Sequence, residues 1–185
     1  DLDAYHVIES APRTVRVNDF TVHARGNDLD DLLGTMERVA PVVHGDPTTD
    51  AESAAALVEA LRAPNKRAET TNIVAVDEHG NGCAITTSLG LGSGVWVPGY
   101  GVHLNSMLGE GELVRGLVPP GTRMGSMMSP LIALDDHGRL AAIAGAAGGS
   151  RIRPALVQCV LRMLRGAAPQ DAIDAPPPDA ARFDS

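Results

Sequence analysis

Aromatic side chains, lysines and cysteines are all scarce in this 185-residue sequence. Aromatic residues make up only 3% of the chain and the net charge is −8, so the sequence offers neither the stacking rings nor the basic face of a nucleic-acid-binding protein. Lys66 is the sole lysine, so anion binding would fall to arginine side chains or backbone amides. We therefore expect no nucleic acid among its partners.

The cysteines and histidines do not form a metal-binding pattern. Cys83 and Cys159 are far apart and lack CxxC spacing, which supports neither a zinc site nor a disulfide framework and predicts two buried thiols. No two histidines have the i, i+4 spacing of a helical metal site. We therefore expect no metal and no cofactor.

Long hydrophobic runs are also missing from the sequence. No apolar stretch approaches the roughly 20 residues needed to span a bilayer, so we expect no membrane partner. The first residues lack a basic start followed by a hydrophobic stretch, and they have the composition of the middle of an element. The sequence leaves the cellular location and an upstream leader open.

Two helices are predicted in the first third of the chain. Residues 28–40 place apolar side chains at helical spacing, with aspartates in the first turn, where the helix dipole favours negative charge. Residues 50–62 repeat the pattern, with Asp50 as the N-cap and Pro64 just after the end. The polar segment 63–69 is predicted to be an exposed linker.

After this linker the apolar residues alternate with a period of two. A hairpin is predicted from Thr71 to Ser88, and a second one between residues 131 and 144. A helix is predicted from 151 to 165. Residues 166–185 are rich in Pro, Ala and Asp and are predicted to be a loosely packed tail.

Thr70 stands at the start of the first predicted hairpin and is a candidate nucleophile. If the bond before it is cleaved, its α-amine can accept the proton of its own hydroxyl, so one residue supplies both base and nucleophile. A Thr-Thr pair before an apolar alternation is also ordinary strand composition. The choice between these interpretations depends on the rest of the chain.

Two glycine-rich segments follow the predicted strands. Residues 90–94 would let the backbone approach a ligand, but such segments are common in plain loops, and the spacing is not that of a phosphate-binding loop. Gly148 and Gly149 precede the last predicted helix, where free backbone N–H groups can bind a carboxylate or an oxyanion. A tight strand-to-helix turn is the alternative.

Four segments occur in one order along the chain: Thr70-Thr71, the glycines at 90–94, Ser126-Met127-Met128-Ser129-Pro130, and Gly148-Gly149-Ser150-Arg151-Ile152. This order resembles the small subunit of γ-glutamyltranspeptidases, which are N-terminal nucleophile hydrolases. The resemblance covers about residues 70–165. It implies an α+β fold, an αββα sandwich that is incomplete in this chain.

The resemblance also implies a division of the chain and roles for individual residues. Residues 1–69 would be the end of a large-subunit-like helical segment plus linker, and residues 70–185 the small-subunit-like catalytic region. Thr70 would be the nucleophile, released by autocleavage, and Ser88 would assist it. The amides of the Gly148-Gly149 pair would form the oxyanion hole of an acyl transfer to water or an amine.

The substrate implied by the resemblance is a small γ-glutamyl amide such as glutathione. Glu110, Arg123 and Ser126 would bind it, although Glu110 also suits a solvated loop carboxylate. Met107 and Met127 replace a glutamine and a serine of the family, and the loop after Ser88 lacks a substrate-binding asparagine. These departures keep two alternatives open: an amidase or acylase of different specificity, and a catalytically silent structural or binding domain.

The resemblance further implies that the chain lacks part of its sandwich. The partner would be the missing large-subunit segment of the same precursor, or a second copy in a homo-oligomer, because exposed sheet edges and apolar faces need to be covered. In the uncut chain Thr70 has a peptide nitrogen in place of a free amine. We therefore expect this species to be inactive.

Overall fold

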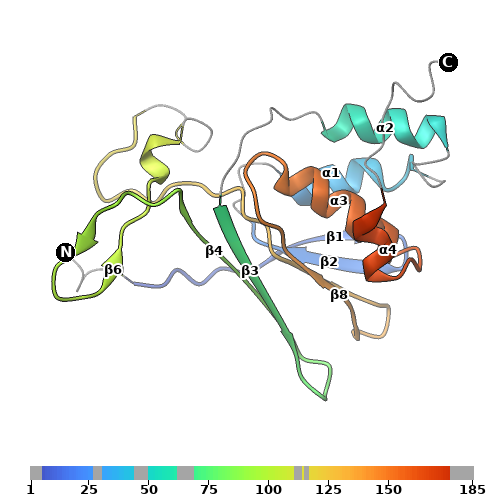
Figure 1. The fold of residues 1–185 in the computed structure, drawn as a ribbon. Helices are drawn as coiled ribbons and strands as arrows, with labels where there is room; N and C mark the ends of the chain where they lie inside the picture. The colour runs from blue at the N-terminus through green and yellow to red at the C-terminus, as the bar shows by residue number, and fades with distance from the viewer. Residues whose placement is uncertain are drawn as a thin grey trace.

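The computed structural model describes residues 6–26, 31–43, 50–61, 69–110, 114 and 117–175. Figure 1 shows helices gathered on one side of an antiparallel sheet and a long two-stranded ribbon on the other side. Helices combined with antiparallel strands confirm the predicted α+β class. None of the helices in these described ranges has the length and apolar character needed to cross a bilayer.

The main sheet has four antiparallel strands in the order β1-β2-β7-β8: β1 (Arg13–Val17), β2 (Phe20–Ala24), β7 (Leu131–Leu134) and β8 (Leu140–Ala144). The hairpin of β7 and β8 was predicted, whereas β1 and β2 were not. A tight turn joins β1 to β2, and Asn18 adopts the left-handed conformation there (φ 51°), which asparagine tolerates. The sheet thus takes two strands from each side of Thr70, and the predicted division at residue 69 stays a prediction.

The helices cover one face of this sheet: α1 (Leu32–Val39), α2 (Ala51–Leu61), α3 (Ile152–Met163) and α4 (Pro169–Asp174). Helix α1 begins four residues later than predicted, because the Asp31 side chain caps it by accepting the Gly34 N–H at 3.1 Å. Residues 27–30 lie outside the described residues. Helix α2 confirms its prediction, and Asp50 is its N-cap, accepting the Ser53 N–H at 2.8 Å.

Helix α4 corrects the prediction of a loosely packed tail. Ala172 is fully buried, and the Arg162 guanidinium of α3 donates to the carbonyls of Ala172 and Ala175 at 3.3 and 3.4 Å. These contacts satisfy carbonyls at the end of a helix that is too short to show a period in the sequence. Residues 176–185 and the linker residues 62–68 lie outside the described residues.

The core lies between the helices and the sheet, and its side chains come from both layers. Burying this apolar surface is the main driving force for joining the two layers. The most deeply buried side chains are Val17, Val22, Leu32, Leu33, Met36, Leu57, Leu131, Ile152, Val157 and Val160.

The ribbon consists of β3 (Glu69–Val76) and β4 (Gly82–Gly90), which confirms the first predicted hairpin. Its even-numbered residues face the main sheet: a Cβ at Gly82 would lie 3.1 Å from the Leu140 side chain of β8. The odd-numbered face is exposed and apolar, with Ile73 55% and Ile85 54% exposed. Cys83 is exposed on that face, so the prediction of two buried thiols is wrong for Cys83.

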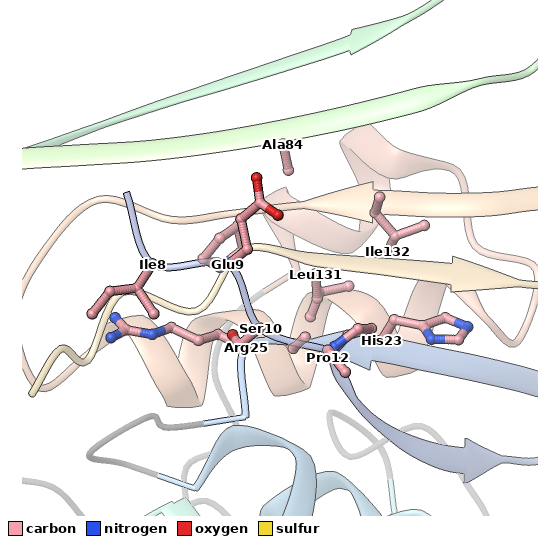
Figure 2. A pocket seen from close by; sticks show the side chains of 12 residues that line it. Ile8, Glu9, Ser10, Pro12, His23, Arg25, Ala84, Leu131 and Ile132 are labelled. Carbon is pink, nitrogen blue, oxygen red and sulfur yellow. The ribbon is translucent and has the colours of Figure 1, made fainter. Parts of the chain in front are cut away.

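A cavity of about 530 Å³ separates part of the ribbon from the main sheet (Figure 2). Ala84 of β4 lies above it, Ile132 of β7 lies across from Ala84, and the Glu9 carboxylate points up toward the ribbon. None of the predicted catalytic residues belongs to its lining. The cavity is therefore a gap in the packing of ribbon on sheet, and we assign it no chemistry.

The two hairpins close with the same type of turn, built on Asp77 and Asp135. Each carboxylate accepts the backbone N–H groups two and four residues further on, at 2.8 to 2.9 Å. The Arg139 side chain adds a bond of 2.7 Å and is the main cause that lowers the pKa of Asp135 to about 2. The pKa of Asp77 is lowered as well, chiefly by the Asn81 side chain.

Replacing Arg139 with alanine should raise the pKa of Asp135 from about 2 toward 3.8, because the largest cause of the lowering is removed. The folded carboxyl titrates below its unfolded value, so its stabilising effect is complete above pH 3.8 and is lost as pH falls through about 2. A carboxyl-carbon NMR titration measures both pKa values. The pKa of Asp77 serves as the internal control, and an unchanged Asp135 titration would contradict the assignment.

Candidate active site

Thr70 lies where the pairing of the ribbon changes register. Glu69 pairs with Gly90 while Thr71 pairs with Thr87, so two residues of β4 lie opposite Thr70. Bulges of this kind re-aim side chains. The Thr70 hydroxyl donates to the carbonyl of Gly148 at 3.3 Å, which brings the start of β3 to the loop between β8 and α3.

A cavity of about 190 Å³ beside Thr70 brings together most of the predicted site residues, and we call it the methionine cavity. An apolar pocket with a few convergent polar groups has the composition of a small-molecule site, and methionines make its wall adaptable. Its lining consists of Thr70, Ser88, Met107, Glu110, Met124, Gly125, Ser126, Met127, Met128 and Gly148.

Backbone hydrogen bonds fix the two serine hydroxyls of the methionine cavity. The Ser88 hydroxyl accepts the N–H of Gly90 at 3.0 Å. The Ser126 hydroxyl accepts the N–H of Met128, also at 3.0 Å. Because both acceptor oxygens are held by backbone donors, neither side chain can turn away from the cavity without losing a bond.

Glu110 carries the one carboxylate among the described residues that line the methionine cavity. It follows the short 3₁₀ helix η2 (Met107–Gly109), and its Oε1 atom is buried with no hydrogen-bond partner among the described residues. A Cβ at Gly90 would lie 2.0 Å from this oxygen, so Glu110 occupies the space that a side chain there would need. A buried carboxylate oxygen without a donor is costly, and a cationic ligand would supply that donor.

Gly148 and Gly149 form the turn that leads from β8 to α3. Gly148 has φ 135°, a conformation that side chains disfavour, and it lines the methionine cavity. Neither glycine donates its N–H to an acceptor among the described residues. Their amides precede the positive end of α3 and are available to stabilise an anion.

Arg123 lies apart from these residues. Its guanidinium donates to the carbonyl of His6, and it lines a separate cavity of about 490 Å³ together with Arg25. The structure thus does not bring Arg123 into the methionine cavity. Within the described ranges no three His, Cys, Asp or Glu side chains cluster closely enough to hold a metal ion.

A second, wider cavity of about 720 Å³ also reaches Thr70 and Ser88, and we call it the hydroxyl cavity. Its other lining residues are Thr71, Thr87, Leu89, Gly90, Leu91, Gly92 and His103. No pattern in the sequence singles out His103. Its place depends on the pairing of β5 (Trp96–Val97) with β6 (Val102–His103), two strands too short to leave a periodic signal in the sequence.

The sequence of this chain is similar to those of known proteins. The family model described as Gamma-glutamyltranspeptidase matches residues 35–181. The glutathione hydrolase proenzyme of Pseudomonas sp. (strain A14) is 33% identical over 61% of this chain and 22% of its own length. That of Bacillus subtilis (strain 168) is 31% identical over 63% and 21%.

The chain is also similar to the Acylase ACY 1 proenzyme of Pseudomonas sp. (strain SE83), with 30% identity over 59% of this chain and 20% of the relative. The chain therefore spans about a fifth of the length of the curated relatives it matches. The family model covers most of the chain, including every residue of both cavities. This protein belongs to the gamma-glutamyltranspeptidase family.

Proposed function

We propose that this chain carries the catalytic centre of a γ-glutamyltranspeptidase-like enzyme, which hydrolyses or transfers an acyl group with Thr70 as the nucleophile. The observation that carries the proposal is the convergence of Thr70, Ser88, Glu110, Ser126 and Gly148 on one cavity. Residues from five separate parts of the chain meet there. The activity belongs to a longer precursor, in keeping with the proenzyme names of relatives about five times as long as the matched segment.

Activation of the precursor is a cleavage before Thr70. In the uncut chain the nitrogen of Thr70 is part of a peptide bond inside β3 and cannot serve as a base. The Thr70 hydroxyl oxygen attacks the Glu69 carbonyl carbon, and the C–N bond breaks to leave an ester and a free amine. Water hydrolyses the ester, so Glu69 ends in a carboxylate and Thr70 begins a new chain.

Catalysis then uses the new amine of Thr70 as the base. The amine accepts the hydroxyl proton while the hydroxyl oxygen attacks the substrate carbonyl, and the Gly148 and Gly149 amides bind the oxyanion that forms. The leaving amine takes up the proton, and a threonyl ester remains. Water or an amine attacks this ester and regenerates Thr70; one oxyanion donor typically contributes roughly 10²- to 10³-fold in turnover.

Glu110 binds the α-ammonium group of the substrate in this proposal. Its buried Oε1 atom lacks a hydrogen-bond donor among the described residues, and an ammonium group supplies both donor and opposite charge. Ser126 lies on the same cavity and binds the substrate carboxylate or carbonyl. We also retain Arg123 as a candidate for binding the substrate from the adjacent cavity.

A second candidate function keeps the nucleophile and changes the acyl group. The four methionines of the cavity present an apolar, adaptable wall, which suits an acyl chain less polar than γ-glutamyl. Similarity to an acylase proenzyme supports the same alternative. Glu110 argues against it, because an apolar acyl chain leaves the buried carboxylate oxygen without a donor.

The missing segment of the precursor is the partner we propose for the exposed face of the ribbon. Ile73 and Ile85 pair across β3 and β4 and are each more than half exposed. An apolar face of this kind is normally covered. A second copy of the chain in a homo-oligomer would cover the same face.

Thr70→Ala should abolish cleavage of the full-length precursor, because no hydroxyl remains to attack the Glu69 carbonyl. Thr70→Ser keeps a hydroxyl and should still cleave. Intact mass spectrometry over several hours distinguishes one chain from two fragments that meet between Glu69 and Thr70. A wild-type precursor that stays uncut would favour a silent structural domain, and cleavage of Thr70→Ala would exclude Thr70 as the nucleophile.

Glu110→Gln should lower kcat/KM for a γ-glutamyl anilide by about 10- to 100-fold, because the bond between opposite charges is lost. The same variant should leave kcat/KM for a glutaryl anilide unchanged, since that substrate has no α-amine. Glu37→Gln, on the exposed face of α1, is the matched control and should alter neither rate. Equal losses on both anilides would mean that Glu110 supports the cavity without binding the amine.

Rates on γ-glutamyl and acyl anilides separate the two candidate functions. The processed enzyme should prefer the γ-glutamyl anilide over an aliphatic acyl anilide of similar length by at least about tenfold, because only the former satisfies Glu110. The measurement is kcat/KM on both substrates under the same conditions. A preference for the aliphatic substrate would favour the acylase alternative.

A further inference from the structure

The linings of the hydroxyl cavity and the methionine cavity share Thr70 and Ser88, so both cavities reach the proposed nucleophile. An amide substrate places its acyl part on one side of the attacked carbonyl and its leaving amine on the other. If the acyl part is held at Glu110 in the methionine cavity, the hydroxyl cavity is the adjoining space that can receive the leaving amine.

His103 is the one ring side chain in the described lining of the hydroxyl cavity, and no lysine, arginine, aspartate or glutamate joins it there. The remaining lining is made of threonine and serine hydroxyls, leucines and glycines. A leaving group with a charged or strongly polar end thus meets His103 as its most polar partner.

Two contacts fix the His103 ring, and a neighbouring glycine leaves room for it. Trp96 stacks on it with ring centroids 4.7 Å apart and an interplanar angle of 10°. The Gly94 N–H donates to its Nε2 atom at 3.1 Å. Gly92, at φ 78°, leaves room for it: a Cβ there would lie 2.7 Å from Cε1.

The bond from Gly94 determines where the ring carries its proton. An Nε2 atom that accepts a hydrogen bond has a free lone pair, so the neutral imidazole is protonated at Nδ1. Nδ1 has no hydrogen-bond partner among the described residues. The ring therefore presents one unused donor, held in place by the stack on Trp96.

We propose that the Nδ1–H of His103 binds a carboxylate oxygen on the leaving amine and is thereby a specificity-determining contact of the hydroxyl cavity. This inference rests on the proposed function, since it assumes that acyl transfer occurs at Thr70. The threonine hydroxyls at positions 71 and 87 line the same space and are further donors to a carboxylate. The role of His103 is to bind the leaving group, and no proton transfer is assigned to it.

The test uses Trp96, the one tryptophan among these 185 residues, as a reporter of the ring on which it stacks. The uncut full-length protein is titrated with leucine and with leucinamide, and the part of the emission change that Trp96→Phe removes is followed. Leucine should bind about tenfold more tightly than leucinamide, because a bond from a neutral donor to a carboxylate is stronger than one to an amide. Equal affinities, or no saturable change with either compound, would overturn the proposal.

Two variants distinguish binding from a structural role. His103→Gln can still accept the Gly94 N–H but has no donor at the position of Nδ1, whereas His103→Asn places an amide donor near that position and loses the bond to Gly94. The preference for leucine should be lost in His103→Gln and partly retained in His103→Asn. The reverse pattern would mean that His103 acts only by holding the glycine-rich loop.

A kinetic assay tests the role of His103 separately from the proposed function. The processed full-length enzyme is assayed with γ-glutamyl-leucine and γ-glutamyl-leucinamide, and kcat/KM should favour the former by about tenfold. An enzyme that cleaves both equally well keeps the proposed function and refutes the role of His103. A protein that never cleaves either substrate, yet still discriminates in the Trp96 titration, refutes the proposed function alone.

Discussion

The candidate site depends on the close approach of Asn72 in β3 to Gly145 at the end of β8. A Cβ at Gly145 would lie 1.9 Å from Oδ1 of Asn72, so only glycine permits this contact. The same oxygen accepts the hydroxyl of Thr86 at 2.8 Å, which ties the contact to β4 as well. Seating the ribbon here places Thr70, two residues before Asn72, against the carbonyl of Gly148, three residues after Gly145.

Two glycine-rich segments border the candidate site, one with available backbone amides and the other with the space of a missing side chain. Gly148 and Gly149 present backbone amides that have no acceptor among the described residues. Gly90 contributes the space that its missing side chain leaves, and Glu110 fills that space with a carboxylate.

The parts of the fold that the sequence predicted have either a regular period over eight or more residues or, in the β7–β8 hairpin, a glycine-containing turn signal between two short strands. The ribbon, α2 and α3 all have such a pattern. Asp50 marks the start of α2 because its carboxylate can cap the free N–H groups there. Strands β1 and β2 were missed because their outward positions carry Thr14, Arg16 and His23, a composition typical of a polar loop. The turn between them, Asn18-Asp19, also lacks the glycine that marks the turn between β7 and β8. Their β assignment depends on pairing with β7, far along the chain.

The site was predictable to the extent that its residues lie in ordered motifs. Thr70, Ser88, Ser126 and the glycine pair come from such motifs, and the structure places most of them around one cavity. The burial of the Glu110 oxygen and the stacking of His103 on Trp96 could not be predicted from the sequence. Both depend on how the segment 89–110 folds back on β3 and β4, which no local pattern encodes.

The proposed cleavage before Thr70 would divide the strands of the main sheet between two chains. Strands β1 and β2 would belong to one product and β7 and β8 to the other, yet β2 and β7 remain paired from Thr21 to Ala24. The helices α1 and α3 contribute to the same buried core from either side of the cut. The two products would thus stay interlocked as a heterodimer without any covalent link, and neither could leave without unfolding the other.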